Sequence, residues 1–188
     1  MSRILVLYGS TYGQTQRVAA RIAEEVEREG HSVDLVWGYQ SPDDLRLSQY
    51  DGIVVAASVL MGRHQPYIRE FARRNAEQLN GMPSAFVSVC GAASGDPPRA
   101  QSYIDRFLLE TGWWRPTVTR SFSGAVAYTR YSPLLRWWLK RISRSQGLPT
   151  DTSRDWDFTE WEQVERFARQ FAATVSKAPR HSMARSVA

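Results

Sequence analysis

The sequence contains a single cysteine, Cys90. An intramolecular disulfide and a metal site built from several cysteines are therefore excluded, and we expect no metal. No apolar run approaches the roughly 18 residues that span a bilayer, so an integral membrane protein is not expected. The N-terminus lacks the pattern of a secretory leader, and together with the scarcity of cysteine this predicts a cytoplasmic location.

Acidic residues are absent between Gly112 and Pro149, although the same stretch contains seven basic ones. The 188 residues carry 24 Lys and Arg against 19 Asp and Glu, which leaves a net charge of +5. Such an excess favours nucleic acid, an anionic membrane surface or an acidic small molecule as partner. Because no nucleic-acid recognition module is apparent, a nucleic-acid partner is not expected.

Short apolar segments alternate with amphipathic ones along the chain. The expected strands are 3–8, 31–37, 52–57, 84–89 and 117–127, and the expected helices are 15–29, 67–79, 100–111 and 159–176. Thr159 and Glu162 have the spacing of a capping box at the start of the last helix. Alternation of this kind predicts an α/β fold with a doubly wound parallel sheet. Five strands suit the order 2-1-3-4-5, whose ligand crevice lies where strands 1 and 3 end.

We expect one domain over residues 1–176 and a flexible basic tail over 177–188. Residues 128–157, between the fifth strand and the last helix, are too many for a plain connection. This segment, here called the insertion, is predicted to carry a basic helix.

The first strand runs directly into a loop rich in small and hydroxyl side chains, after which a helix begins. The loop has the sequence GSTYGQT over residues 9–15. Hydroxyl groups and backbone N–H groups at a helix start favour an anion such as a phosphate monoester. The loop lacks the Gly-Lys-Ser/Thr of a Walker A motif and is not GxGxxG. An ordinary strand–helix turn with a threonine cap remains the alternative.

The same loop resembles the FMN-phosphate loop of flavodoxins. That resemblance implies two further loops around the flavin, after strands 3 and 4, which here are residues 58–64 and 90–96. The residues implied to bind FMN are Ser10, Thr11, Tyr12, Gly13, Gln14, Thr15, Ser58, Val59, Leu60, Met61, Gly62, Cys90, Gly91, Ala92, Ala93 and Gly95.

Residues 57–64, 82–86, 124–128, 150–152 and 157–164 resemble one particular family. It comprises the flavodoxin-like, quinone-dependent protoporphyrinogen oxidases of bacterial haem synthesis. The resemblance implies non-covalent FMN, oxidation of protoporphyrinogen IX to protoporphyrin IX, and transfer of electrons to menaquinone or a similar quinone. A flavodoxin-type electron shuttle and another FMN-dependent quinone reductase are the alternatives, and a homo-oligomer stays open.

Placed on a helix, residues 132–145 have an apolar stripe of Leu135, Trp138, Leu139 and Ile142. Arg136, Lys140 and Arg144 fall on the opposite face, with Trp137 among them. Such a helix suits a membrane surface, which would place the protein at the inner face of the cell membrane. The stripe could instead pack on the domain, and the basic residues could bind the substrate's propionates. The basic and aromatic residues assigned to substrate or membrane are Arg130, Arg136, Trp137, Lys140, Arg141 and Arg144.

Three further side chains have both a functional and an ordinary interpretation. His64 could touch the flavin or the substrate, although a polar loop residue is the simpler interpretation. Cys90 is expected to be a structural thiol because no resolving cysteine exists. Asp151 and Asp155 are expected to fix the insertion by hydrogen bonds. No residue is assigned as a catalytic acid or base.

Overall fold

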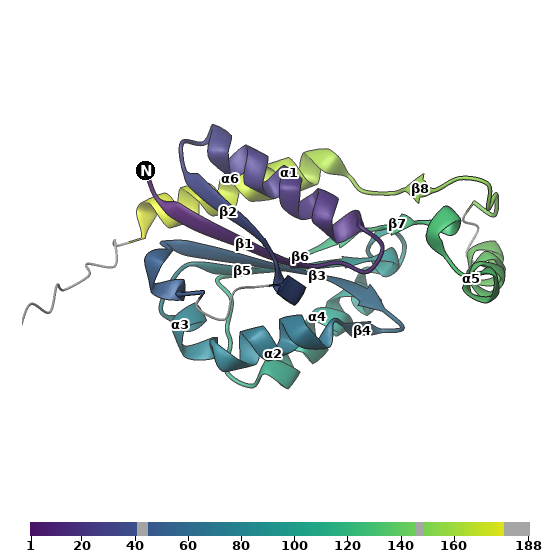
Figure 1. The fold of residues 1–188 in the computed structure, drawn as a ribbon, viewed down its shortest axis with the longest axis horizontal. Coiled ribbons are helices and arrows are strands. Elements are labelled where there is room, and N and C mark those ends of the chain that lie inside the picture. The colour runs from purple at the N-terminus through teal and green to yellow at the C-terminus, as the bar shows by residue number, and fades with distance from the viewer. Residues whose placement is uncertain (41–44, 146–148, 179–188) are drawn as a thin grey trace, which may run out of the picture.

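A parallel β-sheet forms the centre of the protein in a computed structural model, which describes residues 1–40, 45–145 and 149–178 (Figure 1). Its order is β2 (Ser32–Trp37), β1 (Arg3–Gly9), β3 (Gly52–Leu60), β5 (Ser84–Cys90) and β6 (Val118–Ser123). This is the predicted order of five parallel strands. The short β4 (Arg63–His64) turns back antiparallel against the end of β3.

Helices cover both faces of the sheet (Figure 1). One layer contains α1 (Gln14–Arg28) and α6 (Trp161–Lys177), and the other contains α2 (Pro66–Arg74), α3 (Ala76–Asn80) and α4 (Pro97–Thr111). Strand β1 shows why both layers are needed. Ile4 and Val6 join the core on one side, whereas Leu5 and Leu7 join the core on the other. A strand buried on both faces has a continuous apolar sequence, which is the pattern that predicted it.

The insertion forms a small structure of its own at the end of the sheet (Figure 1). It contains a 3-10 turn (Tyr128–Arg130), the predicted basic helix α5 (Pro133–Ser145) and β8 (Trp156–Asp157). Strand β8 pairs antiparallel with β7 (Ala125–Val126). Tyr128 is fully buried and donates a hydrogen bond to Ser143 Oγ at 2.8 Å, which fastens α5 to the base of the insertion.

Two predicted elements are divided in the structure. The helix expected over 67–79 is two helices that meet at Asn75, whose side-chain amide donates to the Phe71 carbonyl oxygen at 2.8 Å. The strand expected over 117–127 stops at Ser123 and resumes after Gly124 as β7. The division arises because β6 pairs with the main sheet, whereas β7 pairs with the insertion.

Two predicted boundaries were also wrong. Strand β3 continues to Leu60 because β4 pairs with its end, so residues 58–60 belong to the strand rather than to a loop. The last helix begins at Trp161, and Thr159 is not its cap. The Thr159 hydroxyl instead donates to the Ser123 carbonyl oxygen at 2.8 Å. The predicted tail falls mainly on residues 179–188, which lie outside the described residues.

Candidate active site

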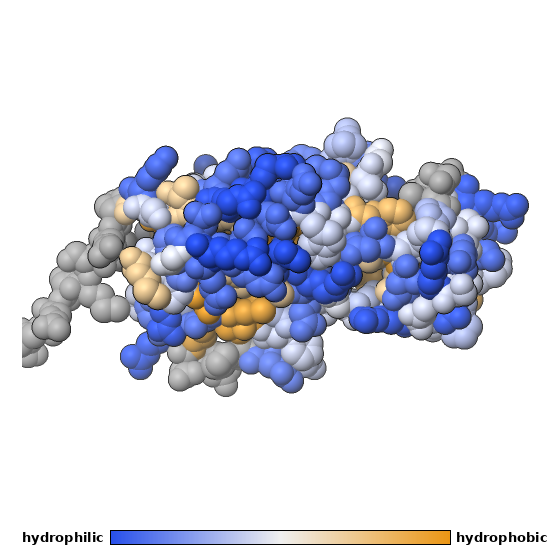
Figure 2. Space-filling view, turned by 90° about the horizontal axis from the view of Figure 1, so that it is seen from above, coloured by the Kyte–Doolittle hydropathy of each residue, from blue (hydrophilic) through white to orange (hydrophobic). Residues whose placement is uncertain are grey.

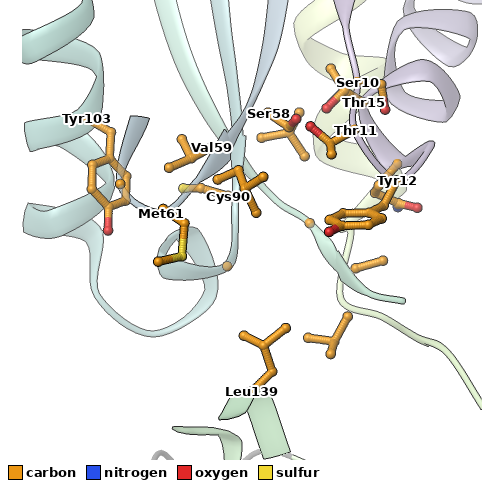
Figure 3. Close-up of a pocket in the computed structure, with 18 of the residues that line it drawn as sticks. Ser10, Thr11, Tyr12, Thr15, Ser58, Val59, Met61, Cys90, Tyr103 and Leu139 are labelled. Carbon is orange, nitrogen blue, oxygen red and sulfur yellow. The ribbon is translucent and has the colours of Figure 1, made fainter. Parts of the chain in front are cut away.

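A cavity of about 640 Å³ opens where β1, β3 and β5 end. Its lining includes most residues that were predicted to bind FMN (Figure 3): Ser10, Thr11, Tyr12, Gln14, Thr15, Ser58, Val59, Leu60, Met61, Gly62, Cys90 and Gly91. Residues far apart in sequence thus meet at one edge of the sheet, as expected for parallel strands. Gly13 lines a neighbouring hollow instead. Ala92, Ala93 and Gly95 do not line the cavity.

One end of the cavity is built for an anion. Gly13 caps α1 with a φ of 93°, and its N–H donates to Ser10 Oγ at 2.9 Å. Thr15 lies in the first turn of α1 and is fully buried, yet its Oγ1 has no hydrogen-bond partner among the described residues. A buried hydroxyl without a partner is costly. At the positive end of a helix, this orphaned hydroxyl fits a phosphate group.

Side chains from distant elements hold this end in place. Gln65 Nε2 donates to Thr11 Oγ1 at 3.2 Å and also to Ser58 Oγ. Gln14 Nε2 donates to Asp157 Oδ1 at 2.9 Å, and Arg17 forms an ion pair with the same carboxylate. Burial opposes ionisation of Asp157, but its hydrogen bonds and the nearby arginine lower its pKa. The loop is therefore tied both to β3 and to the insertion.

The middle of the cavity is mainly apolar and backbone-lined. Met61 has a φ of 52° and is 73% exposed at the rim, next to Gly62 with a φ of 77°. On the neighbouring strand β5, Cys90 is buried, and burial raises the pKa of its thiol. A neutral thiol is a poor nucleophile, which agrees with a structural role for Cys90. A largely apolar space of this kind suits a ring system.

Sequence analysis missed one wall of the cavity. It consists of four residues on a single face of α4, namely Arg99, Ser102, Tyr103 and Arg106. Their spacing of i, i+3, i+4 and i+7 places them on one face of a helix, but a polar face toward solvent has the same spacing. The opposite face of α4 packs in the core through Ala100, Ile104 and Phe107.

Helix α5 forms the remaining wall. Leu135, Trp138 and Leu139 of its apolar stripe line the cavity, and Leu139 points toward the strand ends (Figure 3). Leu135 and Leu139 also pack against the buried cluster of Ala127, Tyr128 and Tyr131, so the stripe contacts a small core as well as the cavity. The side chain of Ile142 lies outside the described residues. Figure 2 shows hydrophobic atoms between the α1 face and the α5 end of the molecule.

The predicted basic residues of the insertion do not line this cavity. Arg130 Nη1 donates to the Tyr12 carbonyl oxygen at 2.7 Å. Arg136 Nη2 donates to the Tyr131 carbonyl oxygen at 3.2 Å. The other four predicted residues are exposed on α5: Trp137, Lys140, Arg141 and Arg144.

His64 is not among the residues that line the cavity, so the suggested contact with flavin or substrate is not supported. The suggestion of a polar loop residue was also wrong, because His64 belongs to a strand and is buried. It is buried on β4 between Phe86 and Phe107, within hydrogen-bond distance (2.9 Å) of Ser88 Oγ. Burial lowers its pKa to about 4, so the ring is neutral near pH 7. The two aspartates of the insertion do fix it by hydrogen bonds: Asp151 accepts from Ser153, and Asp155 accepts from Thr129.

No helix in residues 1–40, 45–145 and 149–178 is long and apolar enough to cross a membrane. Within the same ranges, no cluster of His, Cys, Asp or Glu has the arrangement of a metal site.

Comparison with known proteins identifies the family. The family described as Flavodoxin domain matches residues 5–153. Protoporphyrinogen IX dehydrogenase (quinone) of Escherichia coli K12 is 33% identical over 178 residues, which cover 93% of this chain and 97% of the relative. The chain belongs to this flavodoxin-like family. A Leishmania major protein of the same name is 29% identical, with 98% of this chain and 81% of the relative covered.

Solved structures agree with the fold. Oxidised flavodoxin 1 from Bacillus cereus has a TM-score of 0.57 at 18% identity, with 92% of this chain and 98% of the other covered. A flavodoxin from the domain Archaea has a TM-score of 0.56 at 19% identity, with 93% and 99% covered. Membership of the family makes the chain an oxidoreductase and indicates FMN as its cofactor. The anion-binding end and the apolar middle of the cavity fit the phosphate and the ring of FMN.

Proposed function

We propose that this protein oxidises protoporphyrinogen IX to protoporphyrin IX and passes the electrons to menaquinone or a similar quinone. The names of the relatives from Escherichia coli and Leishmania major support this assignment. The observation that carries it is the lining of the cavity, because residues of α4 and α5 add to the walls that the loops at the strand ends form. We infer that the cavity admits a large flat substrate beside the flavin.

FMN, when bound, supplies the redox chemistry by accepting hydrogen from the substrate and giving electrons to the quinone. The chain's own residues bind and orient. The Thr15 hydroxyl and the N-terminus of α1 would hold the phosphate, while Ser58, Met61 and Gly91 would border the ring. Helix α5 would exclude water through Leu135 and Leu139.

We assign no proton transfer to the side chains that line the cavity. Cys90 and Tyr131 both line the cavity, and burial raises the pKa of each group. Both therefore stay protonated at neutral pH. His64 lies outside the cavity, and none of the described residues lining the cavity is Asp or Glu. Positioning, rather than acid–base catalysis, is the role we assign to these residues.

A quinone dissolved in the bilayer would require contact with the membrane, and α5 has suitable side chains. Leu134 is 77% exposed and Trp137 is 59% exposed. Lys140, Arg141 and Arg144 are exposed on the same helix, and the Arg141 guanidinium lies 5.9 Å from the Trp137 ring centroid. Basic and aromatic residues together favour an anionic interface. We therefore propose peripheral membrane binding through α5.

Vesicle sedimentation tests the membrane proposal. The triple variant Lys140→Glu, Arg141→Glu and Arg144→Glu should bind anionic vesicles at least about tenfold more weakly, since each basic residue near such a surface contributes about 1 kcal/mol. A matched control reverses Arg115, Arg120 and Arg166, which are exposed outside α5. Equal loss of binding in both variants would contradict a role specific to α5.

Anaerobic turnover tests the reaction. Purified FMN-loaded protein, protoporphyrinogen IX and a menaquinone analogue are mixed, and porphyrin fluorescence is followed above the non-enzymatic background. We expect porphyrin formation that depends on both protein and quinone. Absence of turnover by a protein whose flavin is bound and reducible by dithionite would contradict the proposed reaction and favour an electron shuttle.

A further inference from the structure

Helix α4 supplies the positive charge that the described residues place on the cavity wall. Among the described residues that line the cavity, Arg99 and Arg106 are the charged ones, and none is Asp or Glu. They lie seven residues apart on the helix, which is about 10 Å along its axis. Tyr103 lies between them on the same face and is half-buried. The cavity therefore has a positive side that FMN binding by the loops does not explain.

These two guanidinium groups differ from the arginines of the described residues that form ion pairs. Arg69 of the neighbouring α2 forms an ion pair with Glu110, and Arg73 forms one with Glu70. Neither Arg99 nor Arg106 has a carboxylate partner within the described residues. Arg99 Nε instead donates to the Tyr103 hydroxyl at 2.9 Å, and Arg106 Nη1 donates to the Gly62 carbonyl oxygen at 3.4 Å. Both side chains keep donors available for an anion.

The predicted basic residues of the insertion lie outside the cavity lining. Arg130 lines the neighbouring hollow and donates to the Tyr12 carbonyl oxygen, and Arg136 donates to the Tyr131 carbonyl oxygen. Lys140, Arg141 and Arg144 are exposed on α5. Helix α4 therefore supplies the basic residues that line the cavity itself. Charge-assisted hydrogen bonds from arginine to carboxylate are the strongest that a protein surface can offer to such a ligand.

We infer that Arg99 and Arg106 bind the two propionate carboxylates of the substrate and select for a tetrapyrrole that carries them. This inference rests on the proposed function, and it names the substrate-binding wall within the same cavity. Tyr103 acts as a positioning residue, because its hydroxyl accepts a hydrogen bond from Arg99. The ring of the substrate would then face the apolar residues of α5 and the flavin loops.

A comparison of two substrates tests the inference. Protoporphyrinogen IX carries two carboxylates, and its dimethyl ester carries none. Arg99→Gln and Arg106→Gln should each raise KM for the dicarboxylate about tenfold, as expected for loss of one charge-assisted hydrogen bond. The double variant should raise it further, whereas KM for the ester should change less than about twofold. Arg166→Gln, an equal charge change on α6, should leave both values unchanged.

Binding of the stable product gives a second measurement that does not depend on turnover. Protoporphyrin IX should quench the tryptophan fluorescence of the FMN-loaded protein. Its Kd should be lowest for the wild type, higher for each single glutamine variant and highest for the double variant. The variants Arg99→Lys and Arg106→Lys keep the charge and should recover part of the affinity. An equal loss for the dicarboxylate and the ester would overturn the inference, because it would indicate a structural role.

The remaining outcomes separate this inference from the proposed reaction. Unchanged KM and Kd in the double variant, with normal turnover, would refute the carboxylate site and leave the reaction in place. Arginine-dependent porphyrin binding without any turnover in the wild type would support the site and refute the reaction.

Discussion

Replacement of Thr15 by valine separates a ligand-binding hydroxyl from a structural one. The Thr15 side chain is fully buried in the first turn of α1, and its Oγ1 has no partner among the described residues. Valine keeps the β-branched shape and removes the hydroxyl. The apoprotein therefore loses no hydrogen bond, and its free energy of unfolding should stay equal or rise by about 1 kcal/mol, since a buried hydroxyl without a partner is destabilising.

The same Thr15→Val replacement should weaken the binding of FMN. A hydrogen bond to a charged phosphate contributes about 1.5–3 kcal/mol, so the Kd for FMN should rise about 10- to 100-fold. Thr111→Val is the matched control. Thr111 is equally buried, but its Oγ1 donates to the Leu108 carbonyl oxygen at 2.9 Å. Loss of this hydrogen bond in Thr111→Val should lower the apoprotein's free energy of unfolding by about 1 kcal/mol and leave FMN affinity unchanged.

Urea denaturation of the apoproteins and titration of flavin fluorescence measure the two effects. A phosphate-binding role for the Thr15 hydroxyl would be excluded if Thr15→Val lowered apoprotein stability as much as Thr111→Val did while FMN affinity stayed at the wild-type value. That result would place the Thr15 hydroxyl in the structure of the loop rather than at the phosphate.

Two other predictions follow from charge. Thr11→Asp combined with Thr15→Asp should abolish retention of FMN through purification, because carboxylates would face the phosphate; a yellow protein with wild-type flavin stoichiometry would contradict this. In the unfolded chain the pKa of His64 is about 6.5, whereas in the folded protein it is about 4. The unfolded state therefore takes up the proton first as the pH falls. The free energy of unfolding should drop by about 3 kcal/mol between pH 6.5 and about pH 4 because of this group, and should lose nothing to it above pH 6.5. His64→Gln should flatten the pH dependence of the unfolding free energy in that window, and an unchanged slope would show that His64 is not the titrating group.

The sheet could be predicted from sequence because its strands are buried on both faces. Ile4 to Leu7 gave an uninterrupted apolar segment, and short turn signals separated it from the helices. The loops after the strands could then be placed by topology alone, since parallel strands end at one edge. This is why Thr15, Ser58 and Cys90 were correctly expected to lie together.

Features that depend on tertiary pairing could not be predicted in the same way. Thr159 has the spacing of a helix cap, but its hydroxyl bonds to Ser123 across the domain. Gly124 interrupts a strand because its two sides join different sheets. Arg99 and Arg106 were missed because a polar helix face toward a cavity has the same sequence pattern as one toward solvent.

Anaerobic stopped-flow mixing of the FMN-loaded protein with protoporphyrinogen IX shows whether the substrate reduces the flavin, because flavin absorbance and porphyrin fluorescence are recorded together. We expect loss of the oxidised flavin spectrum in step with porphyrin formation, and its return when a menaquinone analogue is added. A flavin that stays oxidised in the presence of protoporphyrinogen IX, while dithionite still reduces it, would rule out the proposed reaction.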